Sequence, residues 1–423
     1  MIKRTMESLA FSDVFGRQMR FVVGPRQAGK TTLARNFLEK KGTPKLYYSW
    51  DDREIKNSYR KDPSFFMKDV LTCKKENEKV WLCFDEIHKM PKWKNILKGI
   101  FDGHEDIIQF IITGSARLDM LKYTGESLLG RYFAFRLFPL TLSELVAVPR
   151  KIEFSLVRPE PSAFVEKVLD GGLTDGGGFD DLLNKSGFPE PFLSDSSIFL
   201  AKWHNDYIEH YIKEDLRDLT NIHELEKVFD LIDILPSKIG NPLSLNSLRE
   251  DIEVSHTAIR TWLTALKLVY VIFAIKPYSK NMIRSLKKAE KCYFFDWTRV
   301  ENDASRFENY IACELFSFCS FLKDAGAGDY ELFYVRTKDG LETDFLITHK
   351  KAPWILFEAK SNEEKMASHH ITHSEALGGI PIVQLIKKKG IVRVSNRKYF
   401  TISADRFFCN LGVSIPDLQR KEI

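Results

Sequence analysis

Several features that would mark a special class of protein are missing from this chain of 423 residues. No apolar run approaches the roughly 20 residues that a membrane-spanning helix needs, and no apolar core follows the basic N-terminus as it would in a signal peptide. The six cysteines show no C-x-x-C spacing, which argues against a structural zinc site and favours free thiols in a reducing compartment. We therefore expect a cytoplasmic protein with no membrane partner.

The charge is too small to decide the class of partner. A net charge of +5 permits nucleic acid as a partner but does not argue for it, so local clusters of basic residues must decide. The hydrophobic fraction of 44% and the charged fraction of 29% are those of an ordinary globular protein. The chain is too long for one hydrophobic core, and we expect roughly two to four domains.

The most informative feature of the sequence is a complete G-x-x-x-x-G-K-T phosphate-binding loop. Residues 20–23 before the loop have the pattern of a buried strand, and residues 32–38 after it have that of a helix. Glycines let successive N–H groups point at a phosphate, and the helix N-terminus adds a partial positive charge. Lys30 is expected to reach the β- and γ-phosphates of ATP, and the Thr31 hydroxyl to hold Mg²⁺. The expected nucleotide-binding residues are Gly24, Pro25, Arg26, Gln27, Ala28, Gly29, Lys30, Thr31 and Thr32.

A second apolar run, residues 80–84, ends in the two acids Asp85 and Glu86. This is the form of a buried parallel strand that delivers carboxylates at its C-terminal end. We expect Asp85 to complete the Mg²⁺ site and Glu86 to polarise the water that attacks ATP.

Two further polar features follow in the same region. A third apolar run, residues 108–112, leads to Thr113 and Ser115, and either hydroxyl could sense the γ-phosphate; a capping role at the end of the strand is the alternative for each. Ser115 is our candidate nucleotide contact. Arg131 is a candidate arginine finger that reaches the nucleotide of a neighbouring subunit, and an ordinary surface arginine is the alternative.

These motifs together resemble those of the prokaryotic AAA-type ATPases that carry a C-terminal restriction-endonuclease-like domain, a family whose function is largely unassigned. The resemblance covers most of the chain except the stretch near residues 149–178 and the C-terminal end. It implies a homo-oligomer, with a hexamer as one candidate. The segments that carry it are residues 24–33, 84–88, 112–115 and 129–131.

The resemblance implies an α/β architecture with three further parts after the P-loop core. These are a helical lid, a winged helix-turn-helix and a C-terminal α/β restriction-endonuclease-like domain. The expected boundaries are 1–148 for the AAA-type ATPase core, 149–222 for the linker and helical lid, 223–296 for the winged helix, and 297–423 for the restriction-endonuclease-like domain.

The expected winged helix also rests on its own residues. A helix that opens near Ser244 or Asn246, a short turn and a helix from residue 254 match the helix-turn-helix arrangement. Residues 269–273 and 291–295 are expected as the strands of a wing. The segment between them is basic, which suits a DNA backbone, and a protein-docking winged helix with a solvated loop is the alternative. Its basic residues are Lys276, Lys280, Arg284, Lys287 and Lys288.

The C-terminal part of the chain carries the residues of a second candidate site. Alternation along residues 354–360 puts Glu358 and Lys360 on one face of a buried strand, and Asp344 on the adjacent strand can join them. An acid pair can hold Mg²⁺, which lowers the pKa of a bound water, and the lysine can steady the charge on a phosphate. With Glu308 upstream in a helix, this order is similar to that of the restriction-endonuclease-like nucleases. The alternative is a scaffold that does not cut DNA.

The sequence therefore favours an ATP-hydrolysing AAA-type protein that binds and processes DNA, as a motor, a branched-DNA helicase or a nuclease-coupled ATPase. The rival interpretation is a nucleotide-switched assembly that binds DNA or protein without cleavage or translocation. A chaperone-like remodeller of protein is a third interpretation, although no pore-loop aromatic residue supports it.

Overall fold

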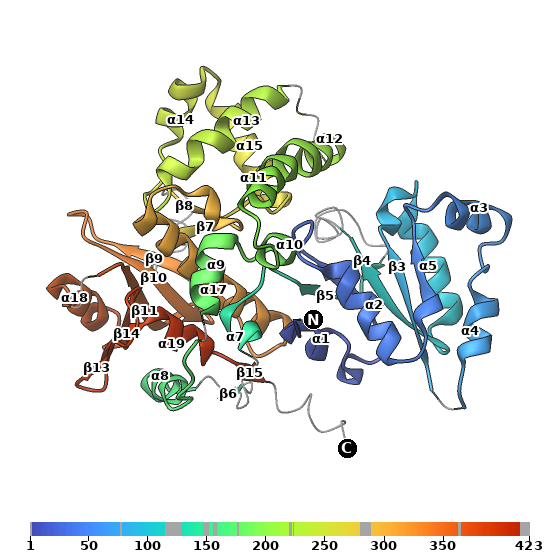
Figure 1. Cartoon of the computed structure of the whole chain (residues 1–423), viewed down its shortest axis with the longest axis horizontal. Coiled ribbons are helices and arrows are strands. Elements are labelled where there is room, and N and C mark those ends of the chain that lie inside the picture. Colours follow the sequence, from blue (N-terminus) through green and yellow to red (C-terminus); the bar gives the residue numbers. More distant parts are fainter. Residues whose placement is uncertain are drawn as a thin grey trace. The chain divides into compact units, whose positions relative to one another are not determined.

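The computed structural model divides the chain into two compact units (Figure 1). Residues 4–138 form the N-terminal unit, and residues 139–419, as far as they are described, form the C-terminal unit. The lid, winged-helix and C-terminal segments expected from the sequence all lie in the C-terminal unit. Among the described helices, none is long and apolar enough to cross a membrane. The structure describes residues 2–76, 78–114, 128–146, 152–154, 159–175, 177–219, 222, 224–279, 289–362 and 365–414.

The N-terminal unit is built on a five-stranded sheet. Its strands are β1 (Met19–Val23), β2 (Tyr47–Ser49), β3 (Val80–Asp85), β4 (Ile108–Thr113) and β5 (Tyr132–Arg136). They lie in the order β2-β3-β4-β1-β5, and every pair is parallel. Parallel strands place all their C-terminal ends at one edge of the sheet. The phosphate-binding loop after β1, Asp85 at the end of β3 and Thr113 at the end of β4 therefore share that edge.

Helices cover both faces of this sheet. On one face, Phe84 and Phe110 belong to a core cluster that also contains Phe101 of α5 (Trp93–His104). On the other face, the Trp81 ring lies 4.9 Å from the Phe37 ring of α2 (Lys30–Lys40), centroid to centroid. Alternation along β3 thus sends neighbouring side chains to different helices. The remaining helices of the unit are α1 (Thr5–Ala10), α3 (Arg53–Lys61) and α4 (Met67–Cys73), with short turns η1 (Asp13–Phe15), η2 (Pro44–Leu46) and η3 (Ile87–Lys89).

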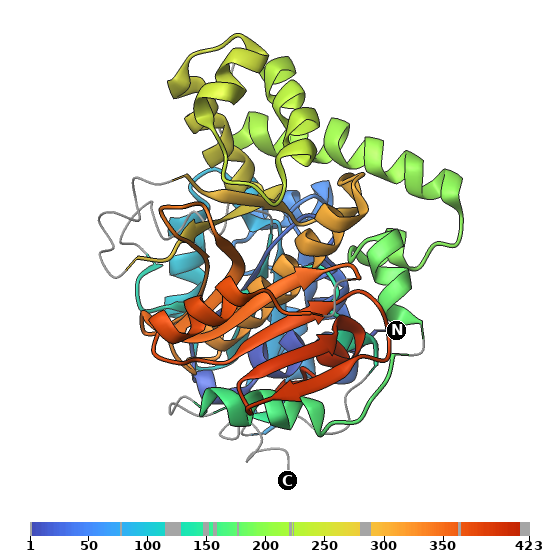
Figure 2. The same ribbon diagram turned by 90° about the vertical axis from the view of Figure 1, so that its left-hand side faces the viewer.

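The C-terminal unit contains an eight-stranded mixed sheet, most of whose strands are the orange and red arrows in Figure 2. Its order is β13-β14-β12-β11-β10-β9-β7-β8. The strands are β7 (Ile272–Pro277), β8 (Lys291–Phe294), β9 (Tyr330–Arg336), β10 (Glu342–His349), β11 (Ala352–Lys360), β12 (Ile382–Ile386), β13 (Val392–Ser395) and β14 (Tyr399–Ser403). A separate two-stranded pair joins β6 (Ile152–Glu153) to β15 (Val413–Ser414).

The two strands expected as a wing pair with each other as predicted, but they belong to the larger sheet. β7 begins three residues after the expected strand, and it pairs in parallel with β9 of the eight-stranded sheet. β8 pairs with β7 and becomes the edge strand of that sheet. A free edge of β7 is available to β9, and pairing satisfies its backbone groups. Lys276 lies in β7, whereas Lys280, Arg284, Lys287 and Lys288 lie outside the described residues.

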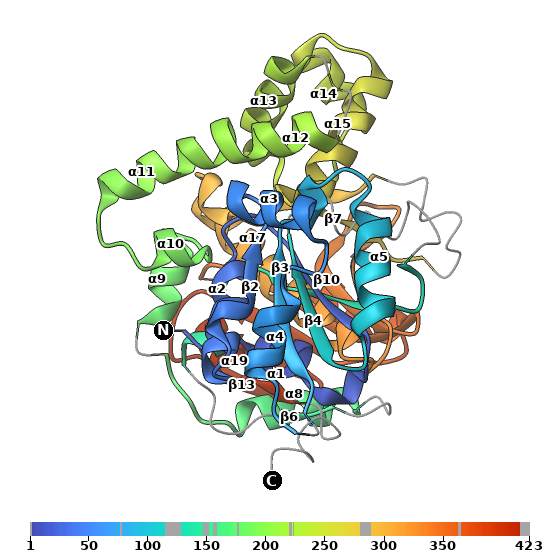
Figure 3. The same cartoon turned by 90° about the vertical axis from the view of Figure 1, so that its right-hand side faces the viewer.

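Helices pack against the sheet and extend from it. The longest helix, α17 (Asp303–Asp324), packs on β8, β9 and β11, and α18 (Ser368–Ala376) packs on β10 and β12. Figure 3 shows α11 (Ser197–Asp206) and α12 (Lys213–Leu219) running as one rod, joined by the π-helix η6 (Tyr207–Ile212). The other helical elements are α7 (Leu142–Leu145), α8 (Pro161–Leu169), α9 (Gly178–Lys185), α10 (Pro189–Phe192), α13 (Leu225–Ile234), η7 (Leu235–Lys238), α14 (Leu245–Ile252), α15 (His256–Leu268), η8 (Trp297–Arg299) and α19 (Ala404–Cys409).

Candidate functional site

The phosphate-binding loop leaves β1 at Gly24 and ends at the first turn of α2. Gly24 has a φ of +142°, and a Cβ atom there would lie 2.2 Å from the carbonyl oxygen of Leu137, so only glycine fits. Gly29, with a φ of +94°, is the N-cap of α2. The free N–H groups of an 11-residue helix therefore begin where the loop ends, as an anion site requires.

The loop brings the predicted lysine and threonines into place. The Lys30 ammonium donates hydrogen bonds to the carbonyl oxygens of Gly24, at 3.0 Å, and Pro25, at 2.5 Å. The ammonium group is thus held within the curve of the loop. Thr31 and Thr32 are exposed on the first turn of α2.

Arg4, which the sequence did not indicate as a site residue, fixes the position of the loop. The guanidinium of Arg4, which is only 8% exposed, donates to the carbonyl oxygens of Ala28, at 2.8 Å, and Phe138, at 2.5 Å. The loop is therefore tied to the segment that follows β5. No local pattern links Arg4 to a loop some 20 residues later, so sequence reasoning could not find it.

Asp85 is the centre of a hydroxyl cluster at the same sheet edge. The Thr31 hydroxyl donates to a carboxylate oxygen of Asp85 at 3.2 Å, and the hydroxyls of Tyr47 and Thr113 also donate to this carboxylate. Burial, followed by the charge of Asp85, raises the pKa of Tyr47. A threonine hydroxyl and a carboxylate are hard oxygen ligands, which is the donor type that Mg²⁺ prefers. The residues present therefore fit a magnesium ion bound together with a nucleotide.

Glu86 lies beside Asp85 in a strained backbone position. Its φ is +56°, and its N–H donates to the carbonyl oxygen of Thr113 at 3.0 Å. Its carboxylate lies 3.3 Å from Nε2 of His88 and 3.9 Å from Nζ of Lys89. Burial, followed by the charge of Asp85, raises the pKa of Glu86 to about 7, while nearby cations act in the opposite direction. A carboxyl group that titrates near neutral pH is suited to accept a proton from water.

The two remaining predictions for this unit have different outcomes. Thr113 faces Asp85, whereas Ser115 lies outside the described residues. Arg131 precedes β5, and its carbonyl accepts the N–H of Met19 at the start of β1. It therefore lies at the sheet edge opposite the phosphate-binding loop, roughly 16 Å along a five-residue strand. Its guanidinium pairs with Asp102 of α5, at 2.7 and 3.0 Å.

The C-terminal unit brings the predicted acids and lysine together on adjacent strands. A β-bulge in β10 between Thr343 and Leu346 lies at Asp344, next to Glu358 of β11. The Asp344 N–H donates to a Glu358 carboxylate oxygen at 3.1 Å, and an Asp344 carboxylate oxygen accepts the Ala359 N–H at 3.0 Å. The Lys360 ammonium lies 2.8 Å from the other Glu358 oxygen.

Glu308 reaches the same place from α17, and two residues outside the prediction join it. The fully buried ammonium of Lys291 lies 2.5 Å from Glu342, 3.3 Å from Glu308 and 3.5 Å from Asp344. Tyr293 also donates its hydroxyl to Glu308 at 2.8 Å. We call Glu308, Glu342, Asp344, Glu358, Lys291 and Lys360 the acidic centre.

Burial and a neighbouring negative charge raise the pKa values of two carboxyl groups in the acidic centre. Burial, followed by the charge of Asp344, raises the pKa of Glu308 to about 7 and that of Glu358 to about 8. In the part of the chain that the structure describes, no three histidine, cysteine or acidic side chains are already arranged around a metal position. Two carboxylates on adjacent strands nevertheless fit one hard cation, because Mg²⁺ commonly takes one or two carboxylates together with substrate phosphate.

Histidines of α18 border the acidic centre, which the sequence did not predict. Nε2 of His370 lies 3.5 Å from Glu358, and Nδ1 shares a hydrogen bond with the Thr343 hydroxyl at 2.8 Å. Nδ1 of His373 contacts the same hydroxyl at 2.8 Å. Burial, followed by the charge of His369, lowers the pKa of His370 to about 4, so this ring is neutral at physiological pH.

The segment expected as a helix-turn-helix, from α14 to α15, has a polar outer surface. Ser244 caps α14, Glu253 turns the chain with a φ of +57°, and Ser255 caps α15. A groove of about 650 Å³ runs beside α15 and is lined by His256, Arg260, Thr264 and Lys267 among others. The exposed residues of α15 are His256, Thr257, Arg260, Thr261 and Thr264.

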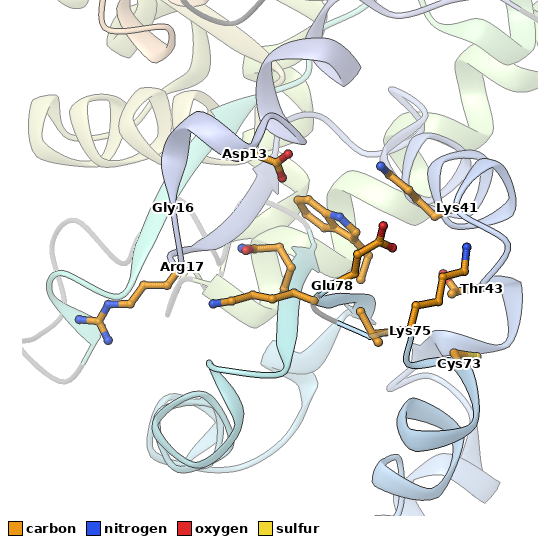
Figure 4. A pocket seen from close by; sticks show the side chains of 12 residues that line it. Asp13, Gly16, Arg17, Lys41, Thr43, Cys73, Lys75 and Glu78 are labelled. Atoms are coloured by element: carbon orange, nitrogen blue, oxygen red, sulfur yellow. The ribbon is translucent and has the colours of Figure 1, made fainter. Parts of the chain in front are cut away.

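A hollow in the surface of the N-terminal unit lies away from the phosphate-binding loop. It has a volume of about 510 Å³ and is lined by Val80 and Gln109 at the starts of β3 and β4. Figure 4 shows Asp13, Lys41, Thr43 and Glu78 around it. Acids and bases are mixed on its walls, and it shares no residue with the nucleotide site.

Known proteins resemble both parts of the chain. The AAA domain family matches residues 16–146, and a domain of unknown function matches residues 177–298. An uncharacterized protein of Methanocaldococcus jannaschii is 24% identical over 410 residues, which covers 88% of this chain and 82% of that protein. Uncharacterized proteins of Mycobacterium bovis and Mycobacterium tuberculosis are 25% identical over 276 residues, 65% of this chain. The match covers 53% of those two proteins, so it spans about half of their length.

Solved structures align over most of the chain but only loosely. The Orc1 protein of Aeropyrum pernix, solved in complex with DNA, is 14% identical with a TM-score of 0.30, covering 74% of this chain and 94% of that chain. Cdc6p of Pyrobaculum aerophilum is 12% identical with a TM-score of 0.26, covering 73% and 93%. Such low TM-scores support no argument about function. The family match and the site geometry support an AAA-type P-loop ATPase domain at residues 16–146.

Proposed function

We propose that this protein hydrolyses ATP with Mg²⁺ and uses it to bind and process DNA, and that its C-terminal unit is a restriction-endonuclease-like domain. The observation that carries the proposal is the meeting of Asp344, Glu358 and Lys360 on adjacent strands, with Glu308 reaching the same place from α17. Glu308 comes from a helix well before the other three in the sequence, and all four belong to the acid and lysine pattern of a metal-dependent nuclease.

In the N-terminal unit, each residue of the nucleotide site has its own role in ATP hydrolysis. A bound Mg²⁺ neutralises charge on the phosphates of ATP. Lys30 and the α2 N-terminus hold those phosphates, while Thr31 and Asp85 hold the ion. Glu86 accepts a proton from the water whose oxygen attacks the γ-phosphorus, and the bond from that phosphorus to the bridging oxygen breaks.

The position of Arg131 supports a homo-oligomer. Because Arg131 lies at the opposite edge of the sheet from its own phosphate-binding loop, it can contact only the nucleotide of a neighbouring subunit. Its ion pair with Asp102 orients the guanidinium in the free chain. We propose that a ring or filament of copies, with a hexamer as one candidate, completes each ATP site with an arginine finger.

The polar surface of α15 supports DNA as the partner. We propose that α14 and α15 act as a helix-turn-helix and that α15 enters the major groove. The exposed Arg260 offers a guanidinium for a base edge or a phosphate, and threonines on neighbouring turns offer hydroxyls. The basic segment with Lys280, Arg284, Lys287 and Lys288 would then contact the backbone.

The acidic centre supports DNA cleavage as the processing step. A divalent ion held by Asp344 and Glu358 would activate water at neutral pH. Lys360 stabilises the charge that grows on the scissile phosphate as the water oxygen attacks phosphorus and the ester P–O bond breaks. Water supplies the proton that the leaving oxygen takes up, so the products are two ends of a cut strand.

Cleavage of duplex, branched and single-stranded DNA with Mg²⁺ or Mn²⁺, with and without ATP, tests this function. Asp344→Ala and Lys360→Ala should abolish cleavage and leave ATP hydrolysis intact. Asp339→Ala is the matched control, because Asp339 is exposed between β9 and β10 and lies outside the acidic centre. If no DNA form is cut by the wild type, or if Asp344→Ala and Lys360→Ala cut like the wild type, the nuclease part of the proposal is wrong.

A second candidate function is a nucleotide-switched assembly that binds DNA without cutting it. The observation that favours it is the position of Lys291, whose ammonium already neutralises three of the carboxylates. In that case, substitutions in the acidic centre would change DNA affinity while no product forms.

A further inference from the structure

The acidic centre contains a cation of its own. Lys291 extends from β8 and its side chain has no exposed surface. Its ammonium lies within 3.5 Å of carboxylates from Glu308, Glu342 and Asp344, which come from α17 and β10. The ring of Tyr334 lies 5.6 Å away and adds its negative face. Three carboxylates around one positive charge form a coordination shell rather than an ordinary ion pair.

This lysine is charged in the folded protein. Its ammonium lies 2.5 to 3.5 Å from carboxylate oxygens of Glu308, Glu342 and Asp344, which are the contacts that a charged lysine makes. Protein atoms also enclose the space around the Lys291 ammonium and Glu308. Gly240 packs so tightly on Glu308 that a Cβ atom there would lie 2.8 Å from a carboxylate oxygen. Lys291 and the backbone therefore fill the space beside Glu308.

The other side of Asp344 is different. There, the two oxygens of Glu358 face the Asp344 N–H, the half-buried Lys360 and Nε2 of His370. Nε2 of His370 is buried and has no hydrogen-bond partner in the described part of the chain. This side has carboxylate oxygens but no fully buried cation, so it is the side where an ion can enter.

We propose that Lys291 takes the place of one metal ion in the acidic centre, so that the centre binds a single divalent cation, between Asp344 and Glu358. This inference rests on the proposed metal-dependent function of the same site. Lys291 is a positioning residue, because its charge holds one Asp344 oxygen toward β8, while the other oxygen, which accepts the Ala359 N–H, faces β11 and the proposed ion. A site with one metal and a fixed ammonium needs only one ion to balance the phosphate.

Counting bound Mn²⁺ by electron paramagnetic resonance on the nucleotide-free full chain tests the proposal. The count for the Asp344→Ala protein is subtracted, so that ions at the phosphate-binding loop or the surface cancel. The wild type should hold one Asp344-dependent ion, and Lys291→Met should hold two, because three carboxylates then lack a cation. Lys267→Met is the matched control, since Lys267 pairs with the single carboxylate of Glu290, at 2.7 Å, and the count should stay at one.

A second measurement uses stability. In a metal chelator, Lys291→Met should unfold at a lower temperature than the wild type, because it leaves buried carboxylates unpaired. Mn²⁺ should restore most of the unfolding temperature that Lys291→Met loses. It should raise the unfolding temperature of the wild type by a smaller amount. A wild-type count of none or two, or an unchanged count in folded Lys291→Met protein, overturns the proposal. If Lys291→Met does not fold, the wild-type count alone decides, with one ion in support.

The outcomes separate this inference from the proposed nuclease function. A wild type that holds one Asp344-dependent ion and cuts no DNA contradicts the nuclease and supports the inference. A wild type that cuts DNA but holds two such ions supports the nuclease and overturns the inference.

Discussion

The hydroxyl oxygen of Thr31 lies 3.2 Å from a carboxylate oxygen of Asp85, which joins the start of α2 to the end of β3. The two residues are 54 positions apart in the sequence, and the parallel sheet brings them to one edge. Lys30 is held by the loop carbonyls close by, and Glu86 follows Asp85 directly. The groups that we propose for ATP hydrolysis therefore lie together in the N-terminal unit.

The lysine of the phosphate-binding loop should be essential for ATP turnover. Lys30→Ala removes the ammonium that the loop holds against the phosphates, and we expect hydrolysis to fall to background. Lys40→Ala is the matched control, because Lys40 ends the same helix and pairs with Glu7 at 2.5 Å. Release of phosphate from ATP measures both. Turnover by Lys30→Ala that equals the control would remove the loop from the mechanism.

The role of Arg131 can be separated from its ion pair with Asp102. If Arg131 is a finger, mixing Arg131→Ala with Lys30→Ala protein should recover part of the ATP turnover, because each mutant supplies the group that the other lacks. Asp102→Ala should keep its turnover, since it removes only the partner of the ion pair. Should Asp102→Ala lose as much activity as Arg131→Ala, and mixing recover nothing, Arg131 acts in the stability of its own subunit.

The stability of the C-terminal unit should depend on pH through Glu314. This buried carboxyl group accepts hydrogen bonds from the Leu142 N–H and the Tyr310 hydroxyl, both at 2.8 Å, and burial raises its pKa to about 8. The folded state thus keeps a proton that the unfolded chain loses near its ordinary pKa of about 4.3. The stabilisation is complete below that value and is lost as the pH rises toward 8, at up to about 1.4 kcal/mol per pH unit.

Thermal unfolding between pH 5.5 and 8.5 tests this dependence. Glu314→Gln keeps an acceptor oxygen and cannot ionise, so its stability relative to the wild type should rise with pH. Glu301→Gln changes an exposed acid and serves as the control. A constant difference between Glu314→Gln and the wild type across this range would contradict the assignment.

The surface of α15 and the basic segment after β7 should control DNA affinity. Arg260→Ala should weaken DNA binding and lower the slope of log affinity against log salt by about one unit if the guanidinium contacts a phosphate. Neutralising Lys280, Arg284, Lys287 and Lys288 together should lower it by up to about one unit per lost contact. Arg53→Ala, an exposed arginine at the start of α3 in the N-terminal unit, is the control. Unchanged affinity and slope in both test variants would point to a protein partner.

The sequence could predict that the residues of the candidate nucleotide site meet, because its signals are local. The loop glycines, Lys30 and Thr31 lie within eight consecutive residues, and Asp85 and Glu86 end an apolar strand whose direction follows from the fold. In the C-terminal unit, alternation along β11 likewise anticipated that Glu358 and Lys360 meet. Arg4 was not predictable, because its contacts with the loop depend on packing alone.

Lys291 could not be recognised from the sequence for a related reason. Residues 291–295 have the pattern of a wing strand, and only the pairing of β7 with β9 carries β8 into the sheet beside α17 and β10. Nothing near Lys291 in the sequence indicates three carboxylates, which come from positions 308, 342 and 344. The same holds for His370, whose contact with Glu358 arises when α18 packs on β10.

The central claim is that ATP hydrolysis serves an action on DNA, and the rate of phosphate release with and without DNA tests it most directly. Wild-type protein should turn over ATP faster in the presence of at least one of duplex, branched and single-stranded DNA. Glu86→Gln should bind ATP but hydrolyse it about 10²-fold more slowly or worse, with every DNA form, because an amide cannot accept the proton from water. A wild type whose turnover is the same with all three DNA forms as without DNA would contradict the claim.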